Sequence, residues 1–229
     1  MRPFRALLAL ALGLAPVAVR AEPATRPIVV ELFTSQGCSS CPPADALLRD
    51  LSRQRTDVLA LAFHVTYWDR LGWPDPFALP AATERQRGYA GISHAGTIYT
   101  PQMVVDGTRD VVGSDQRGVQ AALAAARPVA AAHLAVRDDP AGVTITMAAG
   151  QGKGRVLLIG YDPEHRTQVA RGENAGRALV EANIVRAVDH AGAWSGDAMI
   201  LTRPRPAGKL LAVIVQAADG TILAAARGG

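Results

Sequence analysis

Two cysteines separated by two residues, Cys38 and Cys41, constrain the fold of this chain more than any other feature. An apolar run over residues 28–33 precedes them and is typical of a buried strand. Pro42-Pro43 follows them directly, and prolines fit the first turn of a helix. Residues 44–51 then place their apolar side chains on one helical face. The sequence therefore predicts a strand, a C-x-x-C turn and a helix in direct succession.

The spacing of the two cysteines suits redox chemistry better than structural cross-linking. A bridge between them closes a very small loop, and the entropic stabilisation from a disulfide grows with loop length. Two thiolates also do not complete a four-cysteine zinc site. A thiol at a helix N-terminus has a lowered pKa, because free N–H groups and the helix dipole stabilise the thiolate. We predict that Cys38, as the more exposed cysteine, attacks a target disulfide and that Cys41 resolves the mixed disulfide.

Residues 1–21 have the layout of a secretory signal peptide. Arg2 and Arg5 precede a short apolar core over residues 6–15, and small residues follow up to Ala21. This core is about half the length that a bilayer crossing needs. We therefore expect cleavage after Ala21, no stable membrane insertion afterwards, and a periplasmic or secreted protein.

The basic character of the chain comes mostly from this N-terminal segment. Cleavage would remove three of the 24 basic residues, Arg2, Arg5 and Arg20, which leaves 21 against 20 acidic residues. The remaining chain has no run of Lys or Arg, so nucleic acid is not expected as a partner. The composition, with 49% hydrophobic and 19% charged residues, excludes a disordered chain.

The pattern of apolar runs predicts two domains. In residues 22–127, a second strand is expected near 58–65, a polar helix near 81–89, and a helix near 115–126 capped by Ser114. Asp106-Gly107 between two short apolar runs predicts a hairpin. In residues 128–229, about seven short runs separated by polar or glycine-containing turns predict an all-β sandwich-like domain.

The order of the expected elements in residues 22–127 resembles the thioredoxin fold. More specifically, residues 31–45 (ELFTSQGCSSCPPAD) are similar to the signature of the DUF1223 family, exported thioredoxin-like proteins of bacteria. Four further segments match that family: 64–69 (HVTYWD), 71–73 (LGW), 99–102 (YTPQ) and 171–174 (RGEN). The resemblance covers essentially the whole mature chain and implies an α/β thioredoxin-like first domain. We interpret the segment 171–174 itself as a polar turn or an interdomain contact.

The resemblance implies roles for several residues near the cysteines. Thr100-Pro101 resembles the cis-proline that faces the cysteines in thioredoxin folds, with the backbone of Thr100 free to pair with an extended substrate. Glu31 lies near the place where thioredoxins carry a buried acid that relays a proton to the resolving thiol; the alternative is a surface glutamate. Trp68 and Trp73 are expected to line the substrate crevice or to anchor their loop.

His64 ends the second expected strand, at the edge where α/β sheets bind ligands. With Cys38 and Cys41 it would offer two sulfurs and one nitrogen to copper or zinc. We favour the other interpretation, a histidine held by a hydrogen bond.

The leading prediction is an exported thiol-disulfide oxidoreductase without metal or cofactor. It would act on protein or small-molecule thiols and disulfides, with a membrane protein as one candidate electron donor. The alternatives are a periplasmic metal-delivery protein that uses Cys38, Cys41 and His64, and a non-catalytic interaction protein.

Overall fold

The computed structural model describes residues 25–93 and 96–228. The predicted signal peptide, residues 1–21, lies outside the described residues. The helices are α1 (Pro42–Gln54), the 3-10 helix η1 (Thr66–Leu71), α2 (Pro80–Ile92) and α3 (Gln116–Ala125). The strands are β1 (Ile28–Thr34), β2 (Val58–His64), β3 (Gln102–Val105), β4 (Arg109–Val112), β5 (Leu134–Asp139), β6 (Gly142–Met147), β7 (Gly154–Gln168), β8 (Ala178–Trp194), β9 (Met199–Arg203), β10 (Leu210–Gln216) and β11 (Ile222–Arg227). None of the helices in this described part combines the length and apolar composition that a bilayer crossing requires.

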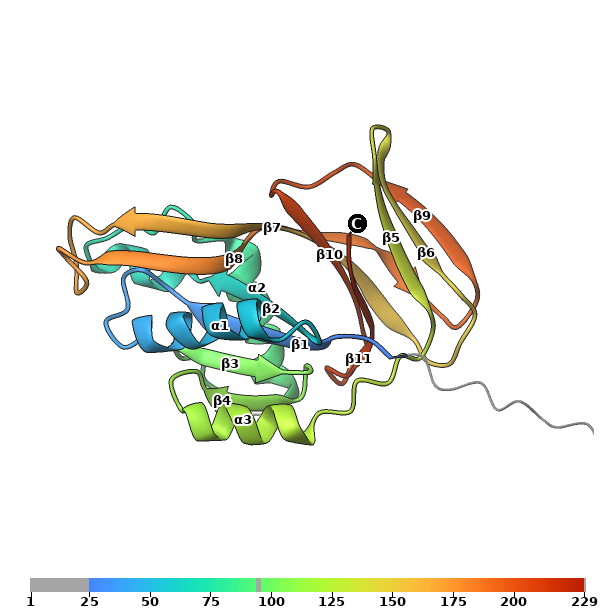
Figure 1. Ribbon diagram of the computed structural model, residues 1–229, viewed down its shortest axis with the longest axis horizontal. Coiled ribbons are helices and arrows are strands. Elements are labelled where there is room, and N and C mark those ends of the chain that lie inside the picture. Colours follow the sequence, from blue (N-terminus) through green and yellow to red (C-terminus); the bar gives the residue numbers. More distant parts are fainter. Residues whose placement is uncertain (1–24, 94–95, 229) are drawn as a thin grey trace, which may run out of the picture.

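An eight-stranded mixed sheet runs through the molecule in the order β11-β10-β7-β8-β2-β1-β3-β4 (Figure 1). Strands β1 and β2 are parallel and end together, with Thr34 paired to His64. Strand β8 joins β2 in parallel through Ala62 and Ile184, and β7 pairs with β8 as a long antiparallel hairpin. Strands β5, β6 and β9 form a separate three-stranded sheet.

The prediction of a thioredoxin-like α/β domain followed by an all-β sandwich-like domain is wrong. Four strands of the main sheet come from residues before 128 and four from residues after it, so the two halves share one sheet. Two of the short apolar runs expected in residues 128–229, namely 156–161 and 183–188, belong to strands of 15 and 17 residues that extend from one half into the other (Figure 1).

The physical reason for this error is that the alternation of apolar and polar residues within a strand does not specify which other strand pairs with it. Neighbours in sequence usually pair, whereas β2 and β8 meet through residues 62 and 184. The register of β7 also shifts at Val156/Leu157 and at Gly160/Tyr161, and such bulges interrupt the period-2 pattern by which a long strand is recognised.

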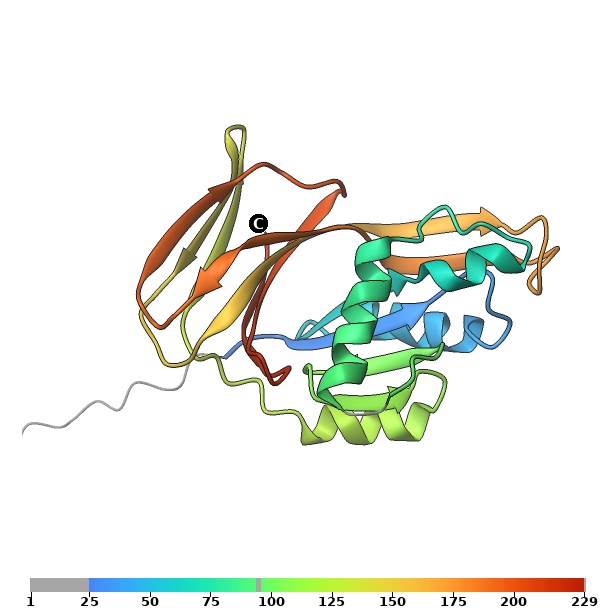
Figure 2. The same ribbon diagram turned by 180° about the vertical axis from the view of Figure 1, so that it is seen from behind.

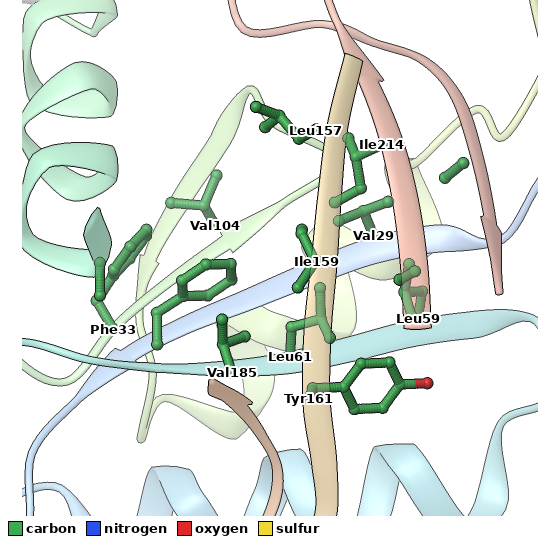
Figure 3. Packing of buried hydrophobic residues seen from close by; sticks show 14 of the residues in the cluster. Val29, Phe33, Leu59, Leu61, Val104, Leu157, Ile159, Tyr161, Val185 and Ile214 are labelled. Atoms are coloured by element: carbon green, nitrogen blue, oxygen red, sulfur yellow. The ribbon is translucent and has the colours of Figure 1, made fainter. Parts of the chain in front are cut away.

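Alternation along β1 and β2 divides the buried side chains between two faces of the sheet. On one face, Val30 and Leu32 pack with apolar residues of α1 and α3. On the other face, Val29 and Phe33 pack with α2 and with side chains of β7, β8 and β10 (Figure 3). Figure 2 shows α2 on this second face. A third cluster fills the space between the outer part of the main sheet and the three-stranded sheet.

The predictions of individual turns and helices agree with the structure more closely than the predicted arrangement of the domains does. The hairpin between β3 and β4 turns at Asp106 and Gly107, whose φ angles are 54° and 75°. The third helix begins as expected, but its cap is Asp115 rather than Ser114. The Asp115 carboxylate accepts a hydrogen bond from the backbone N–H of Gly118 (3.1 Å).

Candidate functional site

A disulfide joins Cys38 to Cys41 where β1 leads into α1, with the two Cα atoms 5.4 Å apart. Cys41 is the N-cap residue of α1, and its carbonyl accepts hydrogen bonds from the backbone N–H groups of Ala44 (2.8 Å) and Asp45 (3.1 Å). The hydroxyl oxygen of Ser40 lies 3.3 Å from the Cys38 sulfur. The C-x-x-C turn therefore occupies the predicted strand-to-helix junction.

Both cysteines are fully buried, with an exposed fraction of 0% each. The expectation that Cys38 is the more exposed cysteine is therefore wrong for the disulfide form. Ser39 and Ser40 are the exposed residues of the turn. A reaction partner thus meets the serines before it meets either sulfur.

The tip of the β7–β8 hairpin, residues 171–176, covers the disulfide. Asn174 is fully buried and donates through Nδ2 to the backbone carbonyls of Gln36 (3.0 Å) and Cys38 (2.9 Å). The Glu173 carboxylate accepts a hydrogen bond from the backbone N–H of Ser39 (3.1 Å), which lowers the pKa of Glu173. Figure 1 shows the hairpin tip beside the loop that enters α1. Of the two interpretations of residues 171–174, a polar turn or an interdomain contact, Glu173 and Asn174 fit the second in that they contact the first half of the chain, although the two halves share one sheet.

The residues predicted to bind substrate surround the same turn. Trp68 donates through Nε1 to the hydroxyl of Thr100 (2.8 Å), and Trp73 donates through Nε1 to the Gln36 side-chain oxygen (3.0 Å). A Cβ atom on Gly37 would lie 3.3 Å from the Cβ of Trp68, so the glycine permits this close approach. The role of these side chains toward a substrate stays a prediction.

The bond between Thr100 and Pro101 is cis, as predicted. Pro101 is buried, and its carbonyl accepts a hydrogen bond from the backbone N–H of Gly113 (2.9 Å). A Cβ atom on Gly113 would lie 3.3 Å from the Cβ of Pro101 and 3.1 Å from that of Ala44. The proline therefore lies beside the first turn of α1, close in space to the C-x-x-C turn.

Glu31 is fully buried, which excludes the surface alternative, but its carboxylate faces α2 rather than the cysteines. It forms a forked ion pair with Arg85, with 2.9 Å between Nη2 and Oε2, and it also accepts a hydrogen bond from the hydroxyl of Tyr89. Gln216 bonds to both partners, to Arg85 at 3.1 Å and to Tyr89 at 3.0 Å. We call these four residues the Glu31–Arg85 network. The predicted relay role requires Glu31 to reach Cys41. From this face of the sheet, Glu31 does not reach it.

A second buried polar group lies on the α1 face of the sheet. It consists of Asp45 in α1, His64 at the end of β2, Asp75 before α2 and Glu181 in β8, and we call it the acid–imidazole cluster. The His64 Nδ1 is 2.7 Å from an Asp75 oxygen, and its Nε2 is 3.7 Å from Glu181 Oε1. The hydroxyl of Thr34 donates to Asp45 (2.7 Å).

Burial and mutual charge shift the pKa values of this cluster. Burial, reinforced by the charge of Glu181, raises the pKa of Asp45 to about 8. Burial alone would lower the pKa of His64, but the charges of Asp75 and Glu181 outweigh it and raise this pKa to about 9. Burial opposes ionisation of Asp75, yet the His64 imidazolium holds the pKa of Asp75 below its usual range. At neutral pH, Asp45 thus carries a proton beside an imidazolium–carboxylate pair.

The favoured interpretation of His64 as a histidine held by a hydrogen bond is confirmed by its contact with Asp75. Both of its ring nitrogens face carboxylates, and the cysteine sulfurs are joined to each other. Within residues 25–93 and 96–228, no group of three or more His, Cys, Asp and Glu side chains is placed to hold a metal ion. The alternative ligand set of Cys38, Cys41 and His64 is not assembled.

Sequence reasoning missed three acids at this site, whereas Asn174 lies in the segment 171–174 that it singled out. Asp45 had a detectable signal, because it lies four residues after Cys41 on a helix and therefore on the same side. Asp75 and Glu181 had none, since their distance from the cysteines along the chain says nothing about their distance in space.

The fold and the site define a class of protein: a mixed-sheet protein with a C-x-x-C disulfide covered by a hairpin from the other half of the chain. The DUF1223 family, described as proteins of unknown function, matches residues 29–216. The chain belongs to this family, which confirms the resemblance seen in the sequence.

Two solved structures are similar to this chain. The crystal structure of protein AGR_C_4864 from Agrobacterium tumefaciens is 33% identical with a TM-score of 0.76, covering 90% of this chain and 95% of that one. HBP35 of Porphyromonas gingivalis, at 14% identity and a TM-score of 0.57, covers 89% of this chain and 74% of that one. The second likeness concerns the fold alone. No curated protein matches the sequence.

Proposed function

We propose that this protein is a thiol-disulfide oxidoreductase whose reactive group is the Cys38–Cys41 disulfide. The observation that carries the proposal is the position of this bond, at the N-cap of α1 beside buried groups with shifted pKa values. A disulfide between residues three apart adds little to stability through chain entropy. Perturbed ionisable groups next to a reactive bond are typical of functional sites.

The reaction exchanges two electrons with a thiol substrate. A substrate thiolate attacks the Cys38 sulfur, the bond to Cys41 breaks, and the Cys41 sulfur keeps the electron pair and takes up a proton. A second substrate thiolate then attacks the mixed disulfide, which releases the substrate as a disulfide and leaves two cysteine thiols. The reverse sequence makes the protein the reductant.

Access to the sulfurs requires the hairpin tip to move. Asn174 bonds to the carbonyl of Cys38, and both cysteines have no exposed surface. Two hydrogen bonds from the Asn174 amide and one from the Ser39 N–H to Glu173 hold the tip on the turn, and a typical hydrogen bond contributes about 0.5–1.5 kcal/mol net. A substrate that binds with a free energy of a few kcal/mol can therefore displace the hairpin tip.

We infer an extracytoplasmic setting from the signal-like residues 1–21, and disulfides persist in such compartments. The proposed partners are protein or small-molecule thiols and disulfides, with a membrane protein as a source of electrons.

The test is an equilibrium titration of the mature chain in glutathione buffers, with free thiols trapped by alkylation and counted by mass spectrometry. We expect one two-electron transition in the folded protein, which Cys38→Ser abolishes. Turnover of a disulfide substrate by the wild type, compared with Cys38→Ser, then establishes catalysis. A disulfide that stays oxidised in every thiol buffer while the protein is folded, or a wild type no faster than Cys38→Ser, would overturn the proposal.

A further inference from the structure

The acid–imidazole cluster is connected to both ends of the C-x-x-C turn. Asp45 lies one helical turn after Cys41, and residues four apart share a helix face. On the other side, Gln36 donates through Nε2 to Glu181 (2.6 Å) and through its backbone N–H to Asp75 (2.8 Å). The cluster therefore contacts the segments that hold each sulfur.

A cavity of about 160 Å³ lies between α1 and β8, and Asp45 and Glu181 both line it. Half-exposed Arg49 and exposed Ala178 also line this cavity, so it reaches the surface. The lining combines these polar side chains with apolar residues, and a cavity of this size has room for water. The two acids thus have a route to solvent that avoids the covered face of the disulfide.

The sulfur of Cys41 needs a proton when the disulfide is reduced. A bare thiolate at this position would be a new negative charge in a site without exposed surface, one helical turn from Asp45 of the cluster. Both burial and like charges disfavour the ionised form. A protonated acid one turn away removes this cost by giving up its proton as the sulfur leaves.

The charge balance of the cluster leaves one proton available. Three acids share one imidazole, and Asp75 is the carboxylate that the His64 imidazolium holds ionised. In the described part of the chain, His64 Nε2 and Glu181 Oε1 are buried without a hydrogen-bond partner. Three further charged groups lie beside the cluster. Arg49 lines the same cavity, Asp69 accepts a hydrogen bond from the backbone N–H of Asp75 (3.1 Å), and the charge of His165 in β7 lowers the pKa of Glu181.

We propose that Asp45 is the proton donor to the Cys41 sulfur during reduction of the disulfide, and that Glu181 and His64 return a proton to Asp45 from solvent through the cavity between α1 and β8. The inference rests on the proposed exchange function. A substrate dithiol supplies both electrons: its sulfur bonds to Cys38, the Cys38–Cys41 bond breaks, and the Asp45 proton moves to Cys41. The Asp45 carboxylate then regains a proton from water.

The test is the rate at which dithiothreitol reduces the disulfide in a single turnover, divided by the concentration of dithiothreitol thiolate, between pH 5 and 10. For the wild type this normalised rate should be constant up to about pH 8, where Asp45 loses its proton, and then fall about tenfold per pH unit. Asp45→Asn should be at least about tenfold slower at pH 7 and should show no fall near pH 8.

Two further variants keep the acid and move its pKa in opposite directions. Thr34→Val removes the hydrogen bond that lowers the pKa of Asp45, so the fall should begin at higher pH. Glu181→Gln removes the negative charge that raises the pKa of Asp45, so the normalised rate should begin to fall at lower pH. These variants decide the question even where Asp45→Asn does not fold.

Asp106→Asn is the matched control. Asp106 is a mostly buried acid paired with Arg26 (2.6 Å), and it follows β3 at the end of the sheet away from the disulfide. Asparagine also tolerates its positive φ. This variant should keep the wild-type profile.

The outcomes separate this inference from the proposed function. A wild-type disulfide that dithiothreitol does not reduce at any pH defeats the exchange function itself. A disulfide that is reduced with a flat normalised profile, or with one that Asp45→Asn, Thr34→Val and Glu181→Gln leave unchanged, defeats only the role of Asp45.

Discussion

The two faces of the main sheet carry buried polar groups of opposite character. On the α2 face, Glu31 and Arg85 form a matched ion pair that Tyr89 and Gln216 complete with hydrogen bonds. On the α1 face, three acids share the single imidazole of His64, and two buried polar atoms of the described residues lack partners. Both groups lie next to strand β1, and only the second is next to the disulfide.

The difference shows how charge balance separates a structural network from a reactive one. A pair with one acid and one base has a stable state in which both are ionised, and its protons do not need to move. An excess of buried acids cannot be fully ionised, so one of them holds a proton. The first arrangement fixes the fold, whereas we propose that the second exchanges a proton with the Cys41 sulfur.

The largest effect should come from breaking the matched pair. Glu31→Leu leaves the Arg85 guanidinium buried without its counter-charge, which should lower the free energy of unfolding by about 3–5 kcal/mol. Urea denaturation measures this loss. The double variant Glu31→Leu/Arg85→Met should recover most of it, because an apolar pair replaces an ionic one. A single variant within about 1 kcal/mol of wild type would show that the network does not stabilise the fold.

The unmatched cluster should instead make stability depend on pH. The pKa of Asp45 rises from 3.8 to about 8 on folding, so between these values the folded state holds a proton that the unfolded chain has lost. Stability therefore falls as pH rises through this window, by up to about 1.4 kcal/mol per pH unit.

His64 acts in the same direction at higher pH, since its pKa rises from 6.5 to about 9. Its contribution is complete below about pH 6.5 and is lost as pH rises through about 9. The lowered pKa of Asp75 acts oppositely, and its contribution is lost only as the pH falls below the usual aspartate range. The melting temperature of the oxidised protein should thus decline from weakly acidic to alkaline pH. Asp45→Asn should flatten this decline below pH 8; an unchanged slope in that variant would contradict the assignment.

A smaller effect is expected at the hairpin tip that covers the disulfide. Asn174→Ala removes the two hydrogen bonds to Gln36 and Cys38, which should lower stability by about 1–2 kcal/mol and speed reduction of the disulfide by dithiothreitol at fixed pH. Arg166→Ala, an exposed change on β7 of the same hairpin, is the control and should alter neither quantity. Reduction at the wild-type rate in Asn174→Ala would mean that the tip does not limit access.

The smallest effect should come from the loop in front of the disulfide. Trp73→Phe keeps an aromatic ring at this position but removes the donor to Gln36, whose amide also bonds to Glu181. A loss of about 0.5–1.5 kcal/mol in thermal or urea unfolding is expected. A loss above about 3 kcal/mol would assign Trp73 to the core instead of to the loop.

The site was predictable where its chemistry is local. The spacing of Cys38 and Cys41, the prolines after them and the apolar stripe that follows are properties of a dozen consecutive residues, and they place a C-x-x-C turn at a helix start. Which acid lies beside the cysteines could not be predicted from the local sequence. Glu31 and Asp45 are both near the cysteines in sequence, but strand alternation turns Glu31 toward α2, while Asp45 lies one helical turn behind Cys41.

The sequence by itself determined the elements, their order and the turn that holds the cysteines, because helix periodicity, turn residues and proline geometry act over a few residues. Only the tertiary structure decided that β8 pairs with β2, that Asn174 covers the disulfide, and that Asp75 and Glu181 meet His64. Each of these contacts joins segments whose local patterns are satisfied equally well by other partners. The burial of the whole sheet selects among them, and burial is a property of the complete chain.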